Sequence, residues 1–363
     1  MNKHLDLLVK PLEEKSIVWF KNSNTYVLVA HETAEIIQHY FKEPSQLHLG
    51  DWIKKRYNLS KNESDMLLKS VLGLIKQLEF KKSITAKKNS TLKIPRQFKI
   101  VKYYNINNIN FKVSYQTDSL FLLIHHKFTH LENNTETKYQ HHFEVLINDD
   151  TIVLNVNGCF EGSWSKDNFH YFQGKFSMKI VEKLYNKPED DWLGVFHASA
   201  ISDGKQNILF LGDSGNGKST LAALLVSQGY TLFADDFVPV EAKTQDVYHF
   251  PAAISIKEKA LKILTPLFPQ LNELPQIDLK YINKSVRYLP TSKGKDSFKA
   301  HLPCKKLVFV KYQKDTNIKL NKLSSEDAFK QLIPDTWLSP IAKNAQLFID
   351  WFATLHCYSL IYS

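Results

Sequence analysis

The chain has 363 residues, of which 43% are apolar and 23% are charged. This ordinary globular composition argues against extensive disorder, and the length exceeds the usual size of one domain, so we expect two or three units. No apolar run approaches the roughly 18 to 20 residues that span a bilayer, and the first residues lack the apolar core of a secretory signal. We therefore expect a cytoplasmic protein with no membrane partner.

The formal net charge of +10 does not by itself indicate a nucleic-acid partner. The lysines are spread along the chain, and short clusters at 81–82 and 87–88 lack the interleaved aromatic residues of a stacking platform. Solvated surface is the expected role of these lysines. The three cysteines, Cys159, Cys304 and Cys357, are too few for a disulfide framework or a thiolate metal site and are expected to be buried, reduced thiols.

Residues 1–90 predict a small α+β module. Two strand-like runs, 17–20 and 26–29, flank a turn-rich stretch and are followed by helical periodicity at 34–40 and 67–78. Ser64 or Asn62 can cap the second helix. The Lys-, Ser- and Thr-rich stretch 81–93 reads as a linker, which indicates a domain boundary near residue 90.

Residues 91–190 predict a β-rich region. Alternation with a period of two is clearest at 143–147 and 152–156, on either side of a turn, which indicates an antiparallel hairpin. Runs 111–115 and 120–124 are expected to add strands. The histidines here show no ligand spacing, so surface or core positions are favoured over a metal site; they are His125, His126, His130, His141 and His142.

The most informative segment follows a buried strand at 207–211. It matches the pattern G-x-x-x-x-G-K-[ST] and leads into a helix that is expected to end near Gly229. Its residues are Gly212, Asp213, Ser214, Gly215, Asn216, Gly217, Lys218, Ser219 and Thr220. The glycines let backbone amides approach phosphate, and the helix N-terminus adds positive potential.

This pattern predicts an ATP site with Mg²⁺. Lys218 is placed to bridge the β- and γ-phosphates, and the hydroxyl of Ser219 to ligate Mg²⁺. A strand at 230–234 ends in Asp235 and Asp236, where one carboxylate can hold Mg²⁺ and the other can take the proton of an incoming hydroxyl. A plain strand-end turn is the alternative for this pair. The pattern alone favours a core position for His197, which lies in a strand expected at 194–200.

Together these segments resemble the HPr kinase/phosphorylase superfamily, and within it the HPr-kinase-related serine kinases. The likeness covers about residues 100–363 and includes segments 250–257, 286–290, 306–312 and 357–360. It implies an ATP-dependent kinase in residues 191–363, with His197 in the active site, Asp236 as general base and Asp235 on the metal. It also implies that Lys257 and Arg287 contact phosphate, although a solvated or ion-paired surface role is the alternative.

The glycine-rich segment that follows the acidic pair in true HPr kinase/phosphorylases is not found in this chain. The resemblance therefore does not extend to phosphate removal or to HPr as the substrate. Residues 1–90 resemble PqqD-type peptide-recognition domains, which are winged-helix-like and bind a leader peptide as an added strand. The expected fold is thus an α/β P-loop kinase domain preceded by a β-rich region and a small winged-helix-like α+β domain.

The leading hypothesis is a kinase that phosphorylates a serine or other hydroxyl of a peptide or protein, with a ribosomally made precursor peptide captured by residues 1–90. A small-molecule hydroxyl kinase is the first alternative, and it would work without residues 1–90. The second is a nucleotide-dependent regulatory protein whose front unit binds DNA, but its expected recognition helix is only mildly basic. The sequence does not indicate the oligomeric state.

Overall fold

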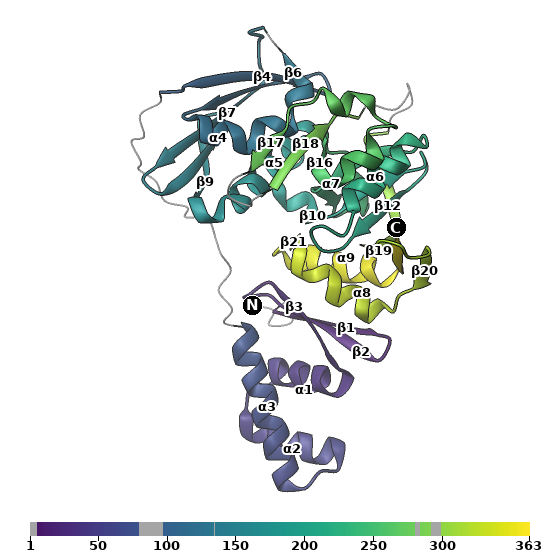
Figure 1. Cartoon of the computed structure of the whole chain (residues 1–363). Coiled ribbons are helices and arrows are strands. Elements are labelled where there is room, and N and C mark those ends of the chain that lie inside the picture. The colour runs from purple at the N-terminus through teal and green to yellow at the C-terminus, as the bar shows by residue number, and fades with distance from the viewer. Residues whose placement is uncertain (1–5, 80–96, 134, 280–283, 292–298) are drawn as a thin grey trace.

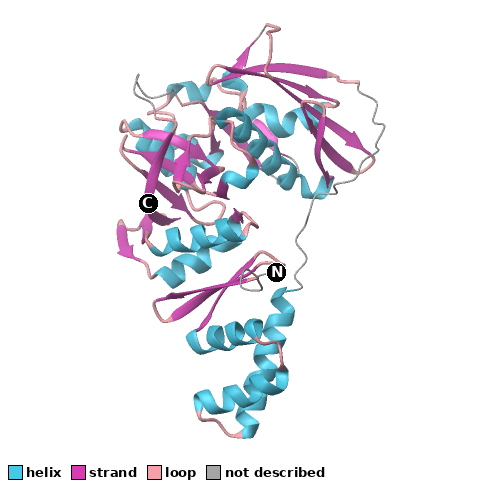
Figure 2. Ribbon diagram, turned by 180° about the vertical axis from the view of Figure 1, so that it is seen from behind, coloured by secondary structure: helices cyan, strands magenta, loops and turns pink. Residues whose placement is uncertain are grey.

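The structure is a computed structural model that describes residues 6–79, 97–133, 135–279, 284–291 and 299–363. The linker and domain boundary expected near residue 90 lie outside the described residues. Within the described part, the strands form four sheets with helices packed on them, so the protein has a mixed α/β fold (Figures 1 and 2). No described helix is long and apolar enough to cross a membrane.

The front unit is a three-stranded antiparallel sheet of order β1-β2-β3, followed by three helices. Its elements are β1 (Leu7–Leu12), β2 (Lys15–Phe20), β3 (Thr25–Ala30), α1 (His31–Lys42), α2 (Gln46–Tyr57) and α3 (Lys61–Glu79). The two predicted strands are confirmed as parts of β2 and β3, and β1 is an additional strand. Both predicted helices are present as α1 and α3.

The start of α3 differs from the prediction. The backbone N–H of Glu63 donates to Ser60 Oγ at 3.4 Å, and the N–H of Ser60 donates to Glu63 Oε2 at 2.8 Å. These reciprocal bonds form a capping box, so Ser60 caps this helix rather than Ser64 or Asn62. Ser64 lies inside the helix, is buried, and donates its hydroxyl to a backbone carbonyl of α2.

The β-rich region is a six-stranded sheet of order β6-β4-β5-β7-β8-β9 in the described residues. Its strands are β4 (Ile100–Ile106), β5 (Ile109–Tyr115), β6 (Glu132–Asn133), β7 (His141–Asn148), β8 (Thr151–Val156) and β9 (Cys159–Ser165). The helical elements are α4 (Asp118–Ile124), η2 (His125–Lys127), η3 (Thr129–Leu131), η4 (Lys166–Asn168), α5 (Phe169–Tyr185) and η5 (Glu189–Asp191). The predicted hairpin is confirmed as β7 and β8, where Asn148 pairs with Thr151.

Two predictions for this region are wrong. Residues 120–124 belong to α4 rather than to a strand, because Thr117 Oγ1 accepts a hydrogen bond from the N–H of Leu120 and caps a helix. A short apolar run does not by itself separate the two structures. Cys159 is exposed at the start of β9, whereas Cys304 and Cys357 are buried free thiols as expected.

The largest sheet has the order β13-β11-β12-β19-β15-β14-β10-β21 among the described residues, with β22 paired to β19 and β20 paired to β22. Its strands are β10 (Trp192–Phe196), β11 (Ser199–Ser202), β12 (Asn207–Leu211), β13 (Thr231–Asp235), β14 (Val238–Glu241), β15 (Asp246–Tyr248), β19 (His301–Tyr312), β20 (Lys319–Lys322), β21 (Thr336–Leu338) and β22 (His356–Tyr362). β12 and β13 are both antiparallel to β11, so they run in the same direction. Their carboxyl ends therefore lie at one edge of the sheet.

The strand predicted at 194–200 is broken into β10 and β11. The N–H of Ala198 donates to Phe196 O at 2.9 Å, which makes a tight three-residue turn around His197. His197 therefore lies between two strands rather than inside one.

A small sheet of order β16-β18-β17 and the remaining helices complete this part of the chain. They are β16 (Ile254–Lys257), β17 (Ile277–Leu279), β18 (Lys284–Leu289), α6 (Lys218–Ser227), α7 (Glu258–Leu264), η6 (Pro269–Asn272), α8 (Ser325–Leu332), η8 (Ile333–Asp335) and α9 (Ala342–Ala353).

The front sheet is buried on both faces. Side chains alternate between the faces of a strand, and in β2 Val18 and Phe20 enter the small core of the front helices. Ile17 and Trp19 point the other way and join the main core, which also contains residues of α8 and α9. In Figure 1, α8 and α9 lie between the front sheet and most of the large sheet.

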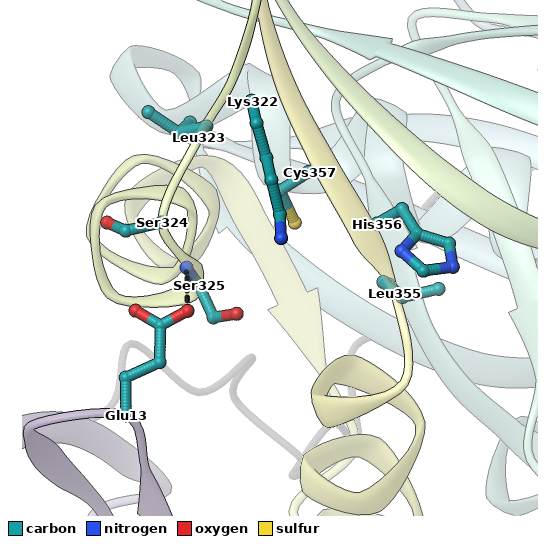
Figure 3. A pocket seen from close by; sticks show the side chains of 8 residues that line it. All are labelled: Glu13, Lys322, Leu323, Ser324, Ser325, Leu355, His356 and Cys357. Atoms are coloured by element: carbon teal, nitrogen blue, oxygen red, sulfur yellow. Dashed lines mark hydrogen bonds between the residues drawn. The ribbon is translucent and has the colours of Figure 1, made fainter.

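Polar contacts hold the same junction. The amide of Asn24 donates to Leu338 O in β21 at 2.8 Å, and Lys10 pairs with Asp350 of α9 at 2.8 Å. Glu13, in the β1–β2 turn, accepts a hydrogen bond from the N–H of Ser325 at the start of α8 at 3.0 Å (Figure 3). A pocket of about 350 Å³ lies beside this last contact. The front sheet is thus attached to the unit that carries the motif residues.

Candidate functional site

The loop between β12 and α6 has the backbone that its glycines predict. Gly212, Gly215 and Gly217 have φ angles of 135°, 103° and 89°, in the left-handed region that favours glycine. A side chain at Gly212 would lie 2.6 Å from Val310 O, and one at Gly217 would overlap the hydroxyl of Tyr362. Glycine is therefore required at both positions, and the predicted strand and helix on either side of the loop are confirmed.

The rest of the loop is arranged around this backbone. Asp213, Ser214 and Gly215 are exposed at its crest, whereas Asn216 and Thr220 are half-buried. From the neighbouring strands, the hydroxyl of Tyr362 donates to Gly217 O at 2.8 Å and the N–H of Tyr312 donates to Asn216 O at 3.1 Å. The loop is thus fixed from the side of β19 and β22.

Lys218 is the first residue of α6 and is buried. Its Nζ donates to the carbonyl oxygens of Gly212 and Asp213, at 2.5 and 3.5 Å. Burial lowers the pKa of this ammonium group, while nearby carboxylates, first those of Asp236 and Asp235, oppose that shift. The structure therefore places the lysine between the loop and the acidic pair.

Asp235 ends β13 and receives several hydrogen bonds. Ser219 Oγ lies 3.0 Å from both carboxylate oxygens, Ser199 Oγ donates to Oδ1 at 2.6 Å, and the N–H of Ser255 donates to Oδ2 at 3.2 Å. Burial raises the pKa of this carboxyl and the charge of Asp236 adds to the effect, although the hydrogen bonds oppose it. A buried carboxylate beside a hydroxyl is a donor set that suits Mg²⁺.

Asp236 lies in a different environment. Its φ of 69° places it in the left-handed region, and its N–H donates to Ala198 O at 2.9 Å. His197 Nδ1 lies 2.9 Å from its Oδ1, and Lys127 Nζ lies 3.6 Å from its Oδ2. Almost half of the carboxylate side chain, 46%, is exposed.

The charges around Asp236 act on both partners of its ion pair with His197. Desolvation would raise the pKa of Asp236, but the hydrogen bond from His197 and the positive charges of Lys127 and Lys218 hold it well below its usual range. The same hydrogen bond raises the pKa of His197. Asp236 is thus an ionised, accessible carboxylate, in contrast to the buried Asp235.

The structure separates Lys257 from Arg287. Lys257 Nζ donates to Ser214 Oγ at 3.4 Å and so lies beside the crest of the loop. Arg287 pairs with Ile256 rather than with Lys257, so its side chain leaves the opposite face of the small sheet. Its Nη1 donates to the carbonyl oxygens of Leu271, Asn272 and Leu274. The structure does not bring Arg287 to the other motif residues.

Three residues of this cluster were not predicted from the sequence. Ser199 pairs with Asp235 across β11 and β13, so the alternation of the strand after His197 was a possible signal. Lys127 comes from η2, away from every motif, and Tyr362 comes from β22, just after the resembling segment 357–360. No local pattern distinguishes either of them.

The donor set fits a nucleoside triphosphate with Mg²⁺. A Cβ at Gly217 would clash with the hydroxyl of Tyr362, so this compact loop requires glycine there. The loop leads directly into α6, whose first turn has backbone amides without partners inside the helix, as an anion site requires. Across the described ranges, no three His, Cys, Asp or Glu side chains gather as a metal-binding group. A metal here would therefore rest on a carboxylate, a hydroxyl and oxygens of the nucleotide.

Comparisons with known proteins add little to this geometry. No family model matches the sequence, and no curated protein matches it. The chain is similar to the solved structure of the Hpr(Ser) kinase/phosphatase from Coxiella burnetii at 14% identity, over 46% of this chain and 78% of that chain, with a TM-score of 0.22. The function is therefore inferred from the residues of the site.

Proposed function

We propose that this protein is a phosphotransferase that moves the γ-phosphoryl group of ATP to a hydroxyl of a peptide or protein. The observation that supports this most directly is the contrast between the two adjacent carboxylates. Asp235 is buried and hydrogen-bonded to Ser219, whereas Asp236 is accessible and paired with His197. Phosphoryl transfer to a hydroxyl uses one carboxylate to hold the metal, as Asp235 could, and another to contact the acceptor hydroxyl, as Asp236 could.

The nucleotide would bind along the loop. Backbone amides between Gly212 and Lys218 would hold the phosphates, and the ammonium of Lys218 would leave its carbonyl partners to contact the β- and γ-phosphates. Ser219 and Asp235 would hold Mg²⁺, which supplies charge neutralisation when bound. Lys257, beside Ser214 at the crest, would contact phosphate from outside the loop.

Asp236 would act as the general base. Its Oδ2 would accept the proton of the acceptor hydroxyl while the acceptor oxygen bonds to the γ-phosphorus of ATP. The bond between this phosphorus and the β,γ-bridging oxygen would break at the same time, and ADP would leave. His197 would hold the other carboxylate oxygen in place. His197, Lys127 and Lys218 hold the pKa of Asp236 well below its usual range, so the group is a carboxylate that can accept a hydrogen bond from the acceptor hydroxyl.

The experiment for this proposal is the substitution Lys218→Ala, with Lys205→Ala as control. Lys205 is an exposed lysine on the β11–β12 turn, outside the cluster. We expect Lys218→Ala to abolish phosphoryl transfer from ATP while thermal melting stays close to that of the control. A folded Lys218→Ala variant with wild-type turnover would show that the loop does not serve this reaction.

The front unit is proposed to recognise the substrate, as a precursor peptide added to the edge of β3. No described strand pairs with the outer edge of β3, and Val27 and Val29 are only partly buried against the front core. An extended peptide can hydrogen-bond to the backbone groups of such an edge while its apolar side chains pack against the adjoining surface.

The proposed location is the cytoplasm, because ATP is the phosphate donor and two of the cysteines are buried free thiols.

Peptide capture is tested in the full chain with Val29→Asp and, as control, Leu47→Asp on α2, where the side chain is 81% exposed. The probe is a synthetic peptide taken from a short, serine-containing reading frame sought beside this gene. We expect Val29→Asp to raise the KM for this peptide at least about tenfold, with kcat nearly unchanged. Equal KM values for the two variants would remove the front unit from recognition, and rapid turnover of a free metabolite would favour a small-molecule kinase.

A further inference from the structure

A lysine from the β-rich region reaches the proposed base. Lys127 ends η2, and its Nζ lies 3.6 Å from Oδ2 of Asp236, while His197 occupies Oδ1 at 2.9 Å. The contact of 3.6 Å is longer than a hydrogen bond, so Oδ2 keeps lone pairs for another donor. Only 25% of the Lys127 side chain is exposed. The ammonium group therefore lies beside the carboxylate oxygen that faces an incoming hydroxyl.

The backbone of Lys127 is tied to the segment that also holds Asp235. Its carbonyl oxygen accepts a hydrogen bond from the N–H of Ala253 at 2.9 Å. Ala253 directly precedes β16, in which the N–H of Ser255 donates to Asp235 Oδ2 at 3.2 Å. One short stretch of chain thus sets the position of both the lysine and the buried carboxylate.

The rest of η2 is fixed by side chains of the β-rich region and the small sheet. His125 Nδ1 lies 2.8 Å from the hydroxyl of Tyr104, in a buried contact. His126 stacks on Tyr288 of β18, with ring planes 11° apart. These contacts fix the backbone of the turn, so the Lys127 side chain extends toward Asp236 from a defined position.

We propose that Lys127 is a catalytic residue that contacts the acceptor oxygen and the phosphoryl group during transfer. This inference rests on the proposed function. An acceptor hydroxyl that donates to Asp236 Oδ2 would lie beside Lys127 Nζ, because both groups face the same oxygen. As the new oxygen–phosphorus bond forms and the proton passes to Asp236, negative charge on the transferred group would be met by the ammonium of Lys127.

The same placement assigns a role to the β-rich region. Lys218 approaches the phosphates from the loop, whereas Lys127 approaches from the side of the acceptor. The acceptor hydroxyl would therefore enter between η2 and the acidic pair. If Lys127 only formed a structural ion pair with Asp236, its removal would change stability little and catalysis not at all. A catalytic role and a structural role of Lys127 therefore predict different results.

The test compares Lys127→Met, Lys127→Arg and the control Lys175→Met. Lys175 lies on α5 in the same region and forms a similarly part-buried ion pair with Glu189. Two kinds of measurement are made besides thermal melting. The first is kcat and KM for the peptide. The second is the affinity for Mg-ADP with and without fluoroaluminate, which mimics the transferring phosphoryl group.

We expect Lys127→Met to lower kcat by about 10²-fold or more and to weaken fluoroaluminate binding at least about tenfold, with Mg-ADP affinity unchanged. Lys127→Arg should recover part of both losses, and Lys175→Met should behave as wild type. A kcat and a fluoroaluminate affinity within twofold of the control would overturn the role of Lys127, as would an arginine variant no better than the methionine variant.

The two proposals fail in different ways. A wild-type protein that binds Mg-ADP but phosphorylates no hydroxyl would refute the proposed function, and the fluoroaluminate affinities would still decide whether Lys127 faces the phosphoryl group. A wild-type protein that does not bind Mg-ADP would refute both.

Discussion

The substitution Trp19→Ala tests whether the front sheet and the unit that carries the glycine-rich loop form one cooperative structure. Trp19 is fully buried in β2 and belongs to the main core together with residues of α9. Its indole N–H donates to Asn24 Oδ1 at 2.8 Å, and the amide of Asn24 donates in turn to Leu338 O. Tyr26, its neighbour on β3, packs edge-on against Phe348 with ring centroids 5.3 Å apart.

The expected magnitude follows from these contacts. Removing a fully buried tryptophan costs about 3–5 kcal/mol, and the orphaned Asn24 carbonyl adds about 1 kcal/mol. Total stabilities are about 5–15 kcal/mol, so a large fraction would be lost. For a unit of this size, each kcal/mol lowers Tm by roughly 2 °C, which gives a decrease of about 8–12 °C.

The assay is thermal melting together with hydrogen exchange followed by peptide. Phe348 also packs against Phe196, the residue before His197, with ring centroids 6.4 Å apart. We therefore expect faster exchange in β10, β21 and α9 as well as in the front sheet. Trp52→Ala, on α2 and outside the main core, is the matched control and should affect the front helices alone.

A front unit that melts separately, with β21 and α9 exchanging as in wild type, would refute this reasoning. The same coupling explains why peptide capture should be tested with point variants. Deleting residues 1–90 would uncover the apolar face of α8 and α9, so a loss of activity would not distinguish recognition from stability.

Further predictions concern the site itself. Asp236→Asn should lower turnover by about 10²-fold or more yet keep Mg-ATP affinity, whereas Asp235→Asn should chiefly weaken Mg²⁺-dependent nucleotide binding. Calorimetric titration with a slowly hydrolysed ATP analogue measures both affinities. Equal losses of affinity in the two variants would contradict the separate roles. Gly217→Ala should lower Tm and nucleotide affinity, because its φ of 89° costs about 1–2 kcal/mol in a non-glycine residue and its Cβ would overlap Tyr362. Adding Tyr362→Phe should recover part of the loss, and no recovery would mean that the backbone angle alone is responsible.

Much of the site could be predicted from the sequence because its signals are local. The glycines of the loop determine backbone angles at their own positions, and the strand before Gly212 and the helix after Gly217 follow from short apolar patterns. The acidic pair was identifiable because it directly follows a strand. A local pattern can also be too short to decide. Residues 120–124 were predicted as a strand but form α4, because so short an apolar run has no periodicity that separates helix from strand.

The tertiary structure decided which distant residues join these motifs. Lys127, Ser199 and Tyr362 reach the cluster through strand pairing and an anchored turn, and Arg287 is directed away from it by the alternation of β18. The two faces of β2 were also ambiguous in sequence, because a strand buried on both sides shows a continuous apolar run. Contacts between residues far apart in the chain depend on how the sheets pack, which no local pattern encodes. The sequence therefore determined the glycine-rich loop and the acidic pair, and the folded chain determined which residues surround them.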